Sequence, residues 1–258
     1  MPILLLKLTL TPILIGGSSL AARRWGPLIG GWIVSLPLTS APVIFFLALD
    51  HGAAFAADAS VGTLVGLGIL GGWCLGYTAL AGRGPFVAVL AAAATFVLLG
   101  IAVQPILGAP FVLLAALAYA AIIVALRFLP AGGSERSEAP HPTWDLPARV
   151  LVGTGIVVGL TTIAPLLGPQ LSGLLATYPV YVSVLSVFTQ LREGPGGASD
   201  VQRGLLKGLF GTIAFYVVLH PALPVLGIGT AFAASIAVAL LIQVAALRNV
   251  RAGAAESA

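Results

Sequence analysis

Long apolar segments follow one another along almost the whole chain, and they constrain its fold more than any other feature. A helix that crosses a bilayer needs about 20 mostly apolar residues, and such segments are separated here by short breaks. Only 8% of the 258 residues are charged, whereas charged residues make up about a quarter of an ordinary soluble domain. Because so few charges cannot cover the surface of a soluble protein, the sequence predicts an all-α, polytopic membrane protein that lies in a lipid bilayer.

The spacing of the apolar segments predicts about nine transmembrane helices in two four-helix units. The expected helices span residues 3–21, 27–49, 59–81, 84–103, 107–128, 149–167, 169–190, 204–220 and 223–247. One long hydrophilic segment, rich in Pro, Gly, Ser and charge, is typical of a linker. We therefore expect a first unit at 1–103, a linking helix and cytoplasmic linker at 104–148, and a second unit with a short tail at 149–258.

The basic residues predict how the chain is oriented. If the N-terminus lies outside, every Lys and Arg except Lys7 falls in a cytoplasmic loop, in the linker or in the C-terminal tail. This is the distribution that the positive-inside rule requires, and the composition fits the inner membrane of a bacterial cell. The net charge of +4 comes without a basic stripe interleaved with aromatic residues, so we expect no nucleic-acid partner.

An internal repeat divides the chain. When the sequence is shifted by 142 residues, 26–67 falls on 168–209 without a gap. The matches include Pro37 with Pro179, Asp58 with Asp200, Gly62 with Gly204 and Gly66 with Gly208. Five expected spans separate the starts of the two units, so the second unit enters the membrane from the opposite side. Such inverted repeats are typical of secondary transporters, whose substrate site lies near the midplane where the repeats meet.

Two prolines mark the expected site. Pro37 and Pro179 lie near the middle of the second and seventh expected helices. A proline inside a helix lacks the N–H donor and crowds the carbonyl four residues earlier, which here belongs to Ile33 and to Leu175. Interrupted helices at matching positions in two halves are the best sequence indication of a transporter site.

Hydroxyl groups surround both prolines, and one lysine lies inside an expected span. An ionisable residue in a membrane span is a functional hypothesis by default, and the repeat equivalent of Lys7 is Arg149. An alternative is that the hydroxyls bond their own helix backbone and that the prolines serve packing. The expected substrate-binding residues are Ser35, Pro37, Thr39, Ser40, Thr177, Tyr178, Pro179, Tyr181 and Lys7.

For the other polar residues and the repeated glycines, we expect structural roles. Asp58 and Asp200 are expected in loops as helix N-caps, and His220 at an outer helix end. The repeated GxxxG pairs at 62–66 and 204–208 indicate close helix packing. The single cysteine, Cys74, excludes an intrachain disulfide, and the chain shows no metal cluster or catalytic motif. We therefore expect no cofactor and no enzymatic activity.

The segment GPLIGGWIVSLPLTSAPVIFFLAL, followed by a short acidic loop and another apolar helix, resembles the GlpM-like bacterial membrane proteins. These are small single four-helix units of poorly defined function. The resemblance covers residues 1–103 and, more faintly, 149–247 through GPQLSGLLATYPV, where Tyr178 replaces Leu36. It implies a tandem, fused version of such a unit and supplies no activity.

Together these features favour a small secondary transporter or permease for a small polar solute, with its site between the second and seventh helices. The alternative is a membrane scaffold or assembly subunit of an envelope pathway that does not transport. A lipid-modifying enzyme is less favoured because catalytic groups are missing. Homo-oligomers are compatible with all three hypotheses.

Overall fold

The computed structural model describes residues 2–38, 40–133, 142–163 and 178–256. It is 89% helical, and the described residues contain no strand. The α-helices are α1 (Pro2–Trp25), α2 (Pro27–Val34), α3 (Ser40–His51), α4 (Ala53–Leu80), α5 (Pro85–Ala102), α6 (Phe111–Phe128), α7 (Asp145–Ile163), α9 (Val180–Leu226) and α10 (Ile228–Glu256), with short 3-10 turns at Ala81–Arg83 and Gln104–Ile106. The expectation of an all-helical chain is confirmed.

Several helices have the dimensions of membrane spans. In the described part of the chain, five segments are long and apolar enough to cross a bilayer: Ala53–Arg83, Pro85–Ala102, Phe111–Phe128, Val180–Leu226 and Ile228–Ala245. Ser40–His51 is a shorter apolar helix. The fold is thus compatible with a membrane protein. The expected helices at 84–103 and 107–128 correspond closely to α5 and α6.

The second expected helix is two helices. α2 ends at Val34 and α3 begins at Ser40, with Pro37 between them. In the second unit, α9 begins at Val180, directly after Pro179. Pro37 therefore stands where a helix is completely interrupted, as the sequence predicted, and Pro179 stands where α9 begins. The turns around these two prolines are the first and second breaks.

Two glycines reverse the chain direction at equivalent places. Gly52 separates α3 from α4 with φ 89°, and Gly194, 142 residues later, interrupts α9 with φ 72°. Only glycine adopts this region without strain. The expectation that Asp58 and Asp200 cap helices from loops is wrong, because both lie inside helices. The glycines make the turns, so α4 and the second arm of α9 begin earlier than predicted.

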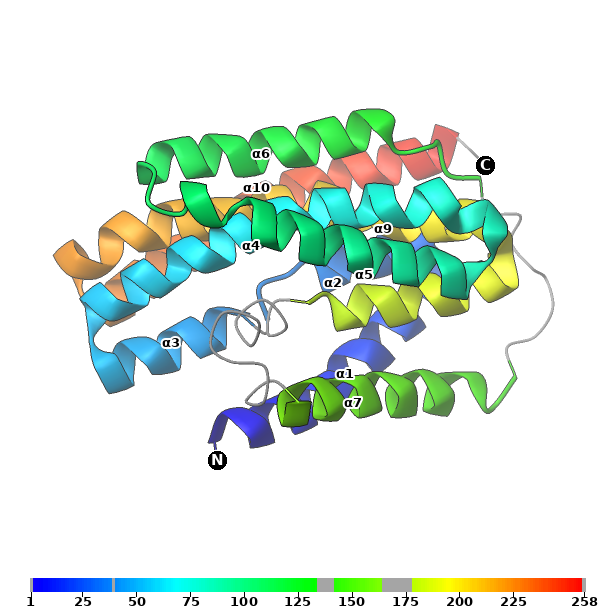
Figure 1. Cartoon of the computed structure of the whole chain (residues 1–258), viewed down its shortest axis with the longest axis horizontal. Helices are drawn as coiled ribbons and strands as arrows, with labels where there is room; N and C mark the ends of the chain where they lie inside the picture. Colours follow the sequence, from blue (N-terminus) through cyan, green and yellow to red (C-terminus); the bar gives the residue numbers. More distant parts are fainter. Residues whose placement is uncertain (1, 39, 134–141, 164–177, 257–258) are drawn as a thin grey trace.

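Equivalent elements run in opposite directions along the molecule (Figure 1). α4 runs from left to right, whereas the second arm of α9, residues 195–226, runs from right to left. α1 and α7, which begin the two units, also run in opposite directions side by side, and the N- and C-termini lie toward opposite ends of the long axis.

Close backbone contacts hold α2 against the second arm of α9. A Cβ atom built on Gly31 would lie 1.8 Å from the carbonyl oxygen of Val201, and one built on Gly204 would lie 1.8 Å from that of Leu28. Gly208 meets the side chain of Ser35. The GxxxG pair of the second unit therefore serves helix packing, as predicted, whereas a Cβ on Gly62 would meet nothing within 4 Å.

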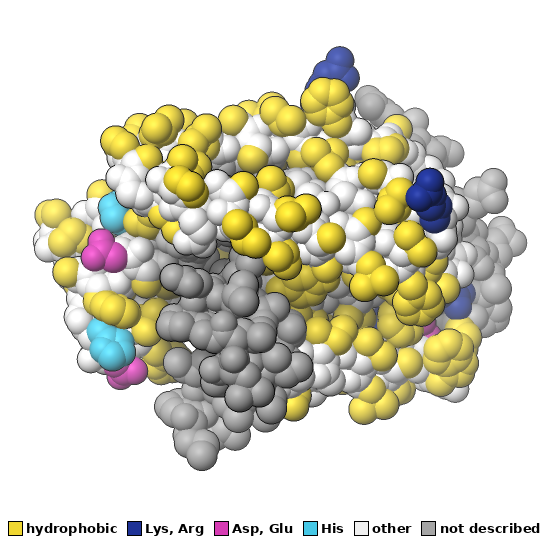
Figure 2. All heavy atoms as spheres, in the orientation of Figure 1, with side chains coloured by type: hydrophobic (Ala, Val, Ile, Leu, Met, Phe, Trp, Pro, Cys, Tyr) yellow, Lys and Arg dark blue, Asp and Glu magenta, His cyan; other side chains and the backbone are white. Residues whose placement is uncertain are grey.

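The visible surface is apolar along much of the helices and carries few charged side chains (Figure 2). Figure 2 shows hydrophobic side chains over most of the visible face, with the His side chains gathered at the left end beside acidic ones, and Lys and Arg side chains elsewhere. Exposed leucines, valines and phenylalanines cover α5, α6 and α10, such as Leu90, Val112 and Leu241. This surface fits contact with lipid.

Candidate functional site

The two helix breaks share one pattern of backbone hydrogen bonds. At the first break, the Leu38 N–H donates to the Leu36 carbonyl over 2.7 Å, and the Ala41 N–H donates to the Pro37 carbonyl over 3.0 Å. At the second, Val180 donates to Tyr178 over 2.9 Å, and Ser183 donates to Pro179 over 3.0 Å. Each donor and acceptor in the second set lies 142 residues after its counterpart. The repeat therefore extends to the local geometry of the breaks.

A proline lies at the centre of each break. The turn there is closed by a hydrogen bond between the residues on either side of the proline, and the fixed φ of proline suits such a turn. Pro179 has φ −81° and ψ 66°, close to the values of an inverse γ-turn. The freed carbonyl expected at Ile33 is not free, because it accepts a hydrogen bond from the Leu36 N–H at 3.2 Å. Its expected counterpart, Leu175, lies outside the described residues.

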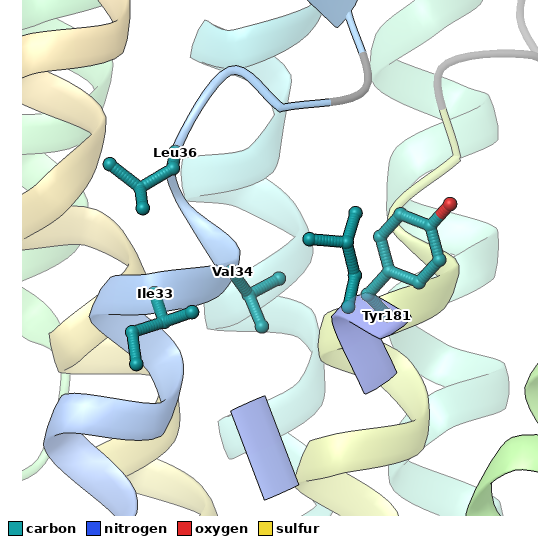
Figure 3. A pocket seen from close by; sticks show the side chains of 5 residues that line it. Ile33, Val34, Leu36 and Tyr181 are labelled. Atoms are coloured by element: carbon teal, nitrogen blue, oxygen red, sulfur yellow. The ribbon is translucent and has the colours of Figure 1, made fainter. Parts of the chain in front are cut away.

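Residues from both breaks line one pocket. A small cavity of about 10 Å³ is lined by Leu14 from α1, Ile33 and Val34 from the end of α2, Leu36 from the first break and Tyr181 from the start of α9. Figure 3 shows the backbone leaving the helical path after Val34, with Val34 and Tyr181 on facing elements. The walls are apolar apart from the tyrosine hydroxyl.

The Tyr181 hydroxyl provides the polar group beside this pocket. It lies 3.1 Å from the Thr11 hydroxyl of α1, and either atom can donate. Thr11 is fully buried. The pair links α1 to the second break, so Tyr181 is a predicted site residue that the structure places at the pocket.

Ser35 lies near the break but faces away from the pocket. Its hydroxyl donates to the Trp32 carbonyl over 2.5 Å, and its own carbonyl accepts from the Thr212 hydroxyl over 2.5 Å. Its side chain also contacts Gly208. Ser35 therefore joins α2 to the second arm of α9, which matches the alternative reading of a hydroxyl bonded to its own helix.

The remaining predicted residues have varied positions. Ser40 begins α3 and interacts with Tyr216. Tyr178 accepts a hydrogen bond from the Ser183 hydroxyl at 3.3 Å, and its ring meets Phe96 edge-on. Thr39 and Thr177 lie outside the described residues, and Lys7 belongs to α1 but its side chain lies outside the described part.

An ion cluster that the sequence did not predict joins α1 to α7. Asp145 accepts from Arg23 over 2.6 Å and from Arg149 over 3.0 Å. The side chains of Asp145 and Arg149 are each 3% exposed, and the Arg149 guanidinium lies 5.1 Å from the Phe188 ring centre. Arg149, paired with Lys7 in the repeat, thus has an ion-pair role. The sequence signal was only the i, i+4 spacing of Asp145 and Arg149.

His220 lies within α9 and is half-buried, so it does not end a helix. Its Nδ1 lies 3.0 Å from the Ala57 carbonyl, and its ring stacks on Phe111 at 4.0 Å. α9 continues past it to Leu226. Within the described residues, no group of three His, Cys, Asp or Glu side chains could hold a metal ion.

No family model, curated protein or solved structure matches this chain. The resemblance to GlpM-like proteins therefore stays a prediction.

Proposed function

We propose that this chain is a small secondary transporter of nine spans, built as an inverted repeat, with its solute site at the pocket between the two helix breaks. One observation carries the proposal: Leu36 and Tyr181, neighbours of the equivalent prolines, line the same space. Interrupted helices that meet in this way form the substrate sites of transporters with inverted repeats.

The opposite directions of α4 and the second arm of α9 support the inverted arrangement. Two similar units in opposite orientation can exchange conformations, which opens a central site to each side of the membrane in turn. The two breaks are suited to this exchange because each contains a short turn in place of a continuous hydrogen-bond ladder. Apolar walls and a single hydroxyl favour a small neutral solute with one polar group.

The orientation we propose places the N-terminus outside and the C-terminus in the cytoplasm of a cell with an inner membrane. The arginines at Arg23, Arg83 and Arg192 then lie at the cytoplasmic end, and Asp50 and His51 lie at the outer end. This assignment follows the positive-inside rule.

Cysteine accessibility tests the proposal without knowledge of the solute. Val34→Cys, in a Cys74→Ala background, places one thiol in the pocket. We expect an impermeant thiol reagent to modify it from either side of proteoliposomes. Replacing both Pro37 and Pro179 by Ala should restrict modification to one side, because continuous helices would hold one conformation. Pro110→Ala, at the start of α6, is the matched control and should leave both reactions unchanged.

Modification of Val34→Cys from only one side in the parent would contradict alternating access. An unchanged pattern in the double proline variant would show that the breaks do not govern access. Either result would favour the non-transporting scaffold.

A further inference from the structure

A second group of polar side chains lies in the bundle interior, away from the pocket. The first arm of α9 comprises residues 180–193. All members of the group are buried, with exposed fractions between 0% and 6%: Trp73 and Tyr77 of α4, Ser186 and Gln190 of the first arm of α9, and Gln202 of the second arm. Six of their atoms have no hydrogen-bond partner among the described residues: Trp73 Nε1, Tyr77 Oη, Ser186 Oγ, Gln190 Oε1, Gln202 Oε1 and Gln202 Nε2.

One hydrogen bond and one ring contact indicate that these residues of α4 and α9 lie near one another. The Gln190 amide donates to the Ala81 carbonyl over 2.7 Å, so one turn earlier Ser186 lies beside Tyr77 on the parallel α4. The Trp73 and Tyr77 ring centres are 5.5 Å apart.

The second arm reaches the same level. His220 contacts Ala57, and the second arm runs antiparallel to α4 (Figure 1). With the same rise per residue in both helices, Gln202 lies level with the stretch between Trp73 and Tyr77. α4 and the two arms of α9 therefore place their polar side chains at the same height along the long axis of the bundle.

The chemistry of these groups indicates a neutral ligand. Trp73 Nε1 and Gln202 Nε2 are donors, Gln190 Oε1 and Gln202 Oε1 are acceptors, and the two hydroxyls can do both. None is charged. Buried polar groups in folded proteins nearly always have a partner, either protein or ordered water, and buried waters typically make about three hydrogen bonds each.

We propose that this interior cluster is a hydrated site, in which bound water molecules connect Trp73, Tyr77, Ser186, Gln190 and Gln202. The site takes small neutral molecules that both donate and accept hydrogen bonds, and water is the smallest of these. The repeat does not duplicate this site, because the repeat equivalents of Ser186 and Gln190 are Ile44 and Ala48. It does not depend on the proposed transport function.

Hydroxyl-radical footprinting of the full-length protein in nanodiscs tests this site. X-ray pulses split bound water, and the radicals oxidise the side chains that touch it. We expect Tyr77 and Trp73 to be oxidised at rates comparable to those of exposed tyrosine and tryptophan, such as Trp144, although both are 0% exposed.

Two variants test whether the radicals come from water bound in the cluster. Gln202→Leu and, separately, Ser186→Ala should each lower the oxidation of Tyr77 by at least threefold while leaving Tyr119, on α6, unchanged. Because the parent protein alone gives the first result, failure of a variant to fold does not block the test. Oxidation of Tyr77 and Trp73 in the parent as slow as that of the buried Phe215, after correction for intrinsic reactivity, would overturn the proposal. Equal oxidation of Tyr77 in parent and both folded variants would overturn it too.

Discussion

Asp145 is a buried carboxylate that forms ion pairs with two arginines. It accepts hydrogen bonds from Arg23 and Arg149 in a place where its side chain is 3% exposed. Burial raises its pKa, but the two arginines lower it more, so the net pKa lies below the ordinary value of 3.8. The ionised form is therefore the one that stabilises the fold.

Asp145→Asn should destabilise the protein by about 3 kcal/mol at pH 7, because removing one partner of a buried ion pair leaves the other charge uncompensated. Since the folded pKa is depressed, the stabilisation is present above pH 3.8 and is lost as the pH falls through the folded pKa. The gap in unfolding midpoint between parent and variant, followed by thermal melts in detergent, should therefore begin to narrow below pH 3.8 and should shrink further as the pH falls.

Asp58→Asn is the matched control, because Asp58 is an exposed carboxylate inside α4. It should change the unfolding midpoint little at any pH. A difference between parent and Asp145→Asn that persists unchanged at pH 3 would mean that the carboxylate acts through packing and not through its charge.

At the scale of elements, the contact between α2 and α9 can be tested by mutation, because the repeat provides a matched control glycine outside that contact. Gly204 and Gly62 are repeat equivalents, yet a Cβ on Gly204 would strike the Leu28 carbonyl, whereas one on Gly62 meets nothing within 4 Å. Gly204→Ala should destabilise by about 1–3 kcal/mol through overpacking. Gly62→Ala should be neutral or stabilise by up to about 1 kcal/mol, because alanine favours the helix.

The fraction of protein that stays monodisperse after heating, measured by size-exclusion chromatography, compares the two variants. Similar losses for both would mean that α2 does not pack on α9 as described.

The elements also show what the sequence could predict. Proline lacks an N–H, so the breaks at Pro37 and Pro179 follow from local chemistry. Gly52 and Gly194 turn the chain within otherwise helical segments, and periodicity does not distinguish such a turn from a loop, so Asp58 was misplaced. The direction of Ser35 depends on Gly208 and Thr212, which lie far away in the sequence, and only the packed structure brings them together.

At the scale of the whole molecule, the question is which ends of the two units face the same side of the membrane. Ala54 and Pro195 follow the equivalent turns at Gly52 and Gly194, and both are exposed. Gly196, the strict equivalent of Ala54, is unsuitable for substitution because its Cβ would lie 2.5 Å from the Gly133 carbonyl. Cys74 is the single cysteine of the chain and is 0% exposed. Replacing it with Ala therefore leaves each introduced cysteine as the sole thiol.

Single variants Ala54→Cys and Pro195→Cys in this background measure the orientation directly. In intact cells, an impermeant thiol reagent should modify Ala54→Cys, whereas Pro195→Cys should react only after lysis. The reason is that α4 and the second arm of α9 start at opposite ends of the molecule (Figure 1), and the arginines near Gly194 favour the cytoplasm. Reaction of both thiols from the same side would contradict the inverted repeat and remove the mechanical basis for alternating access. Reaction from opposite sides would support the inverted repeat on which the proposed alternating access depends.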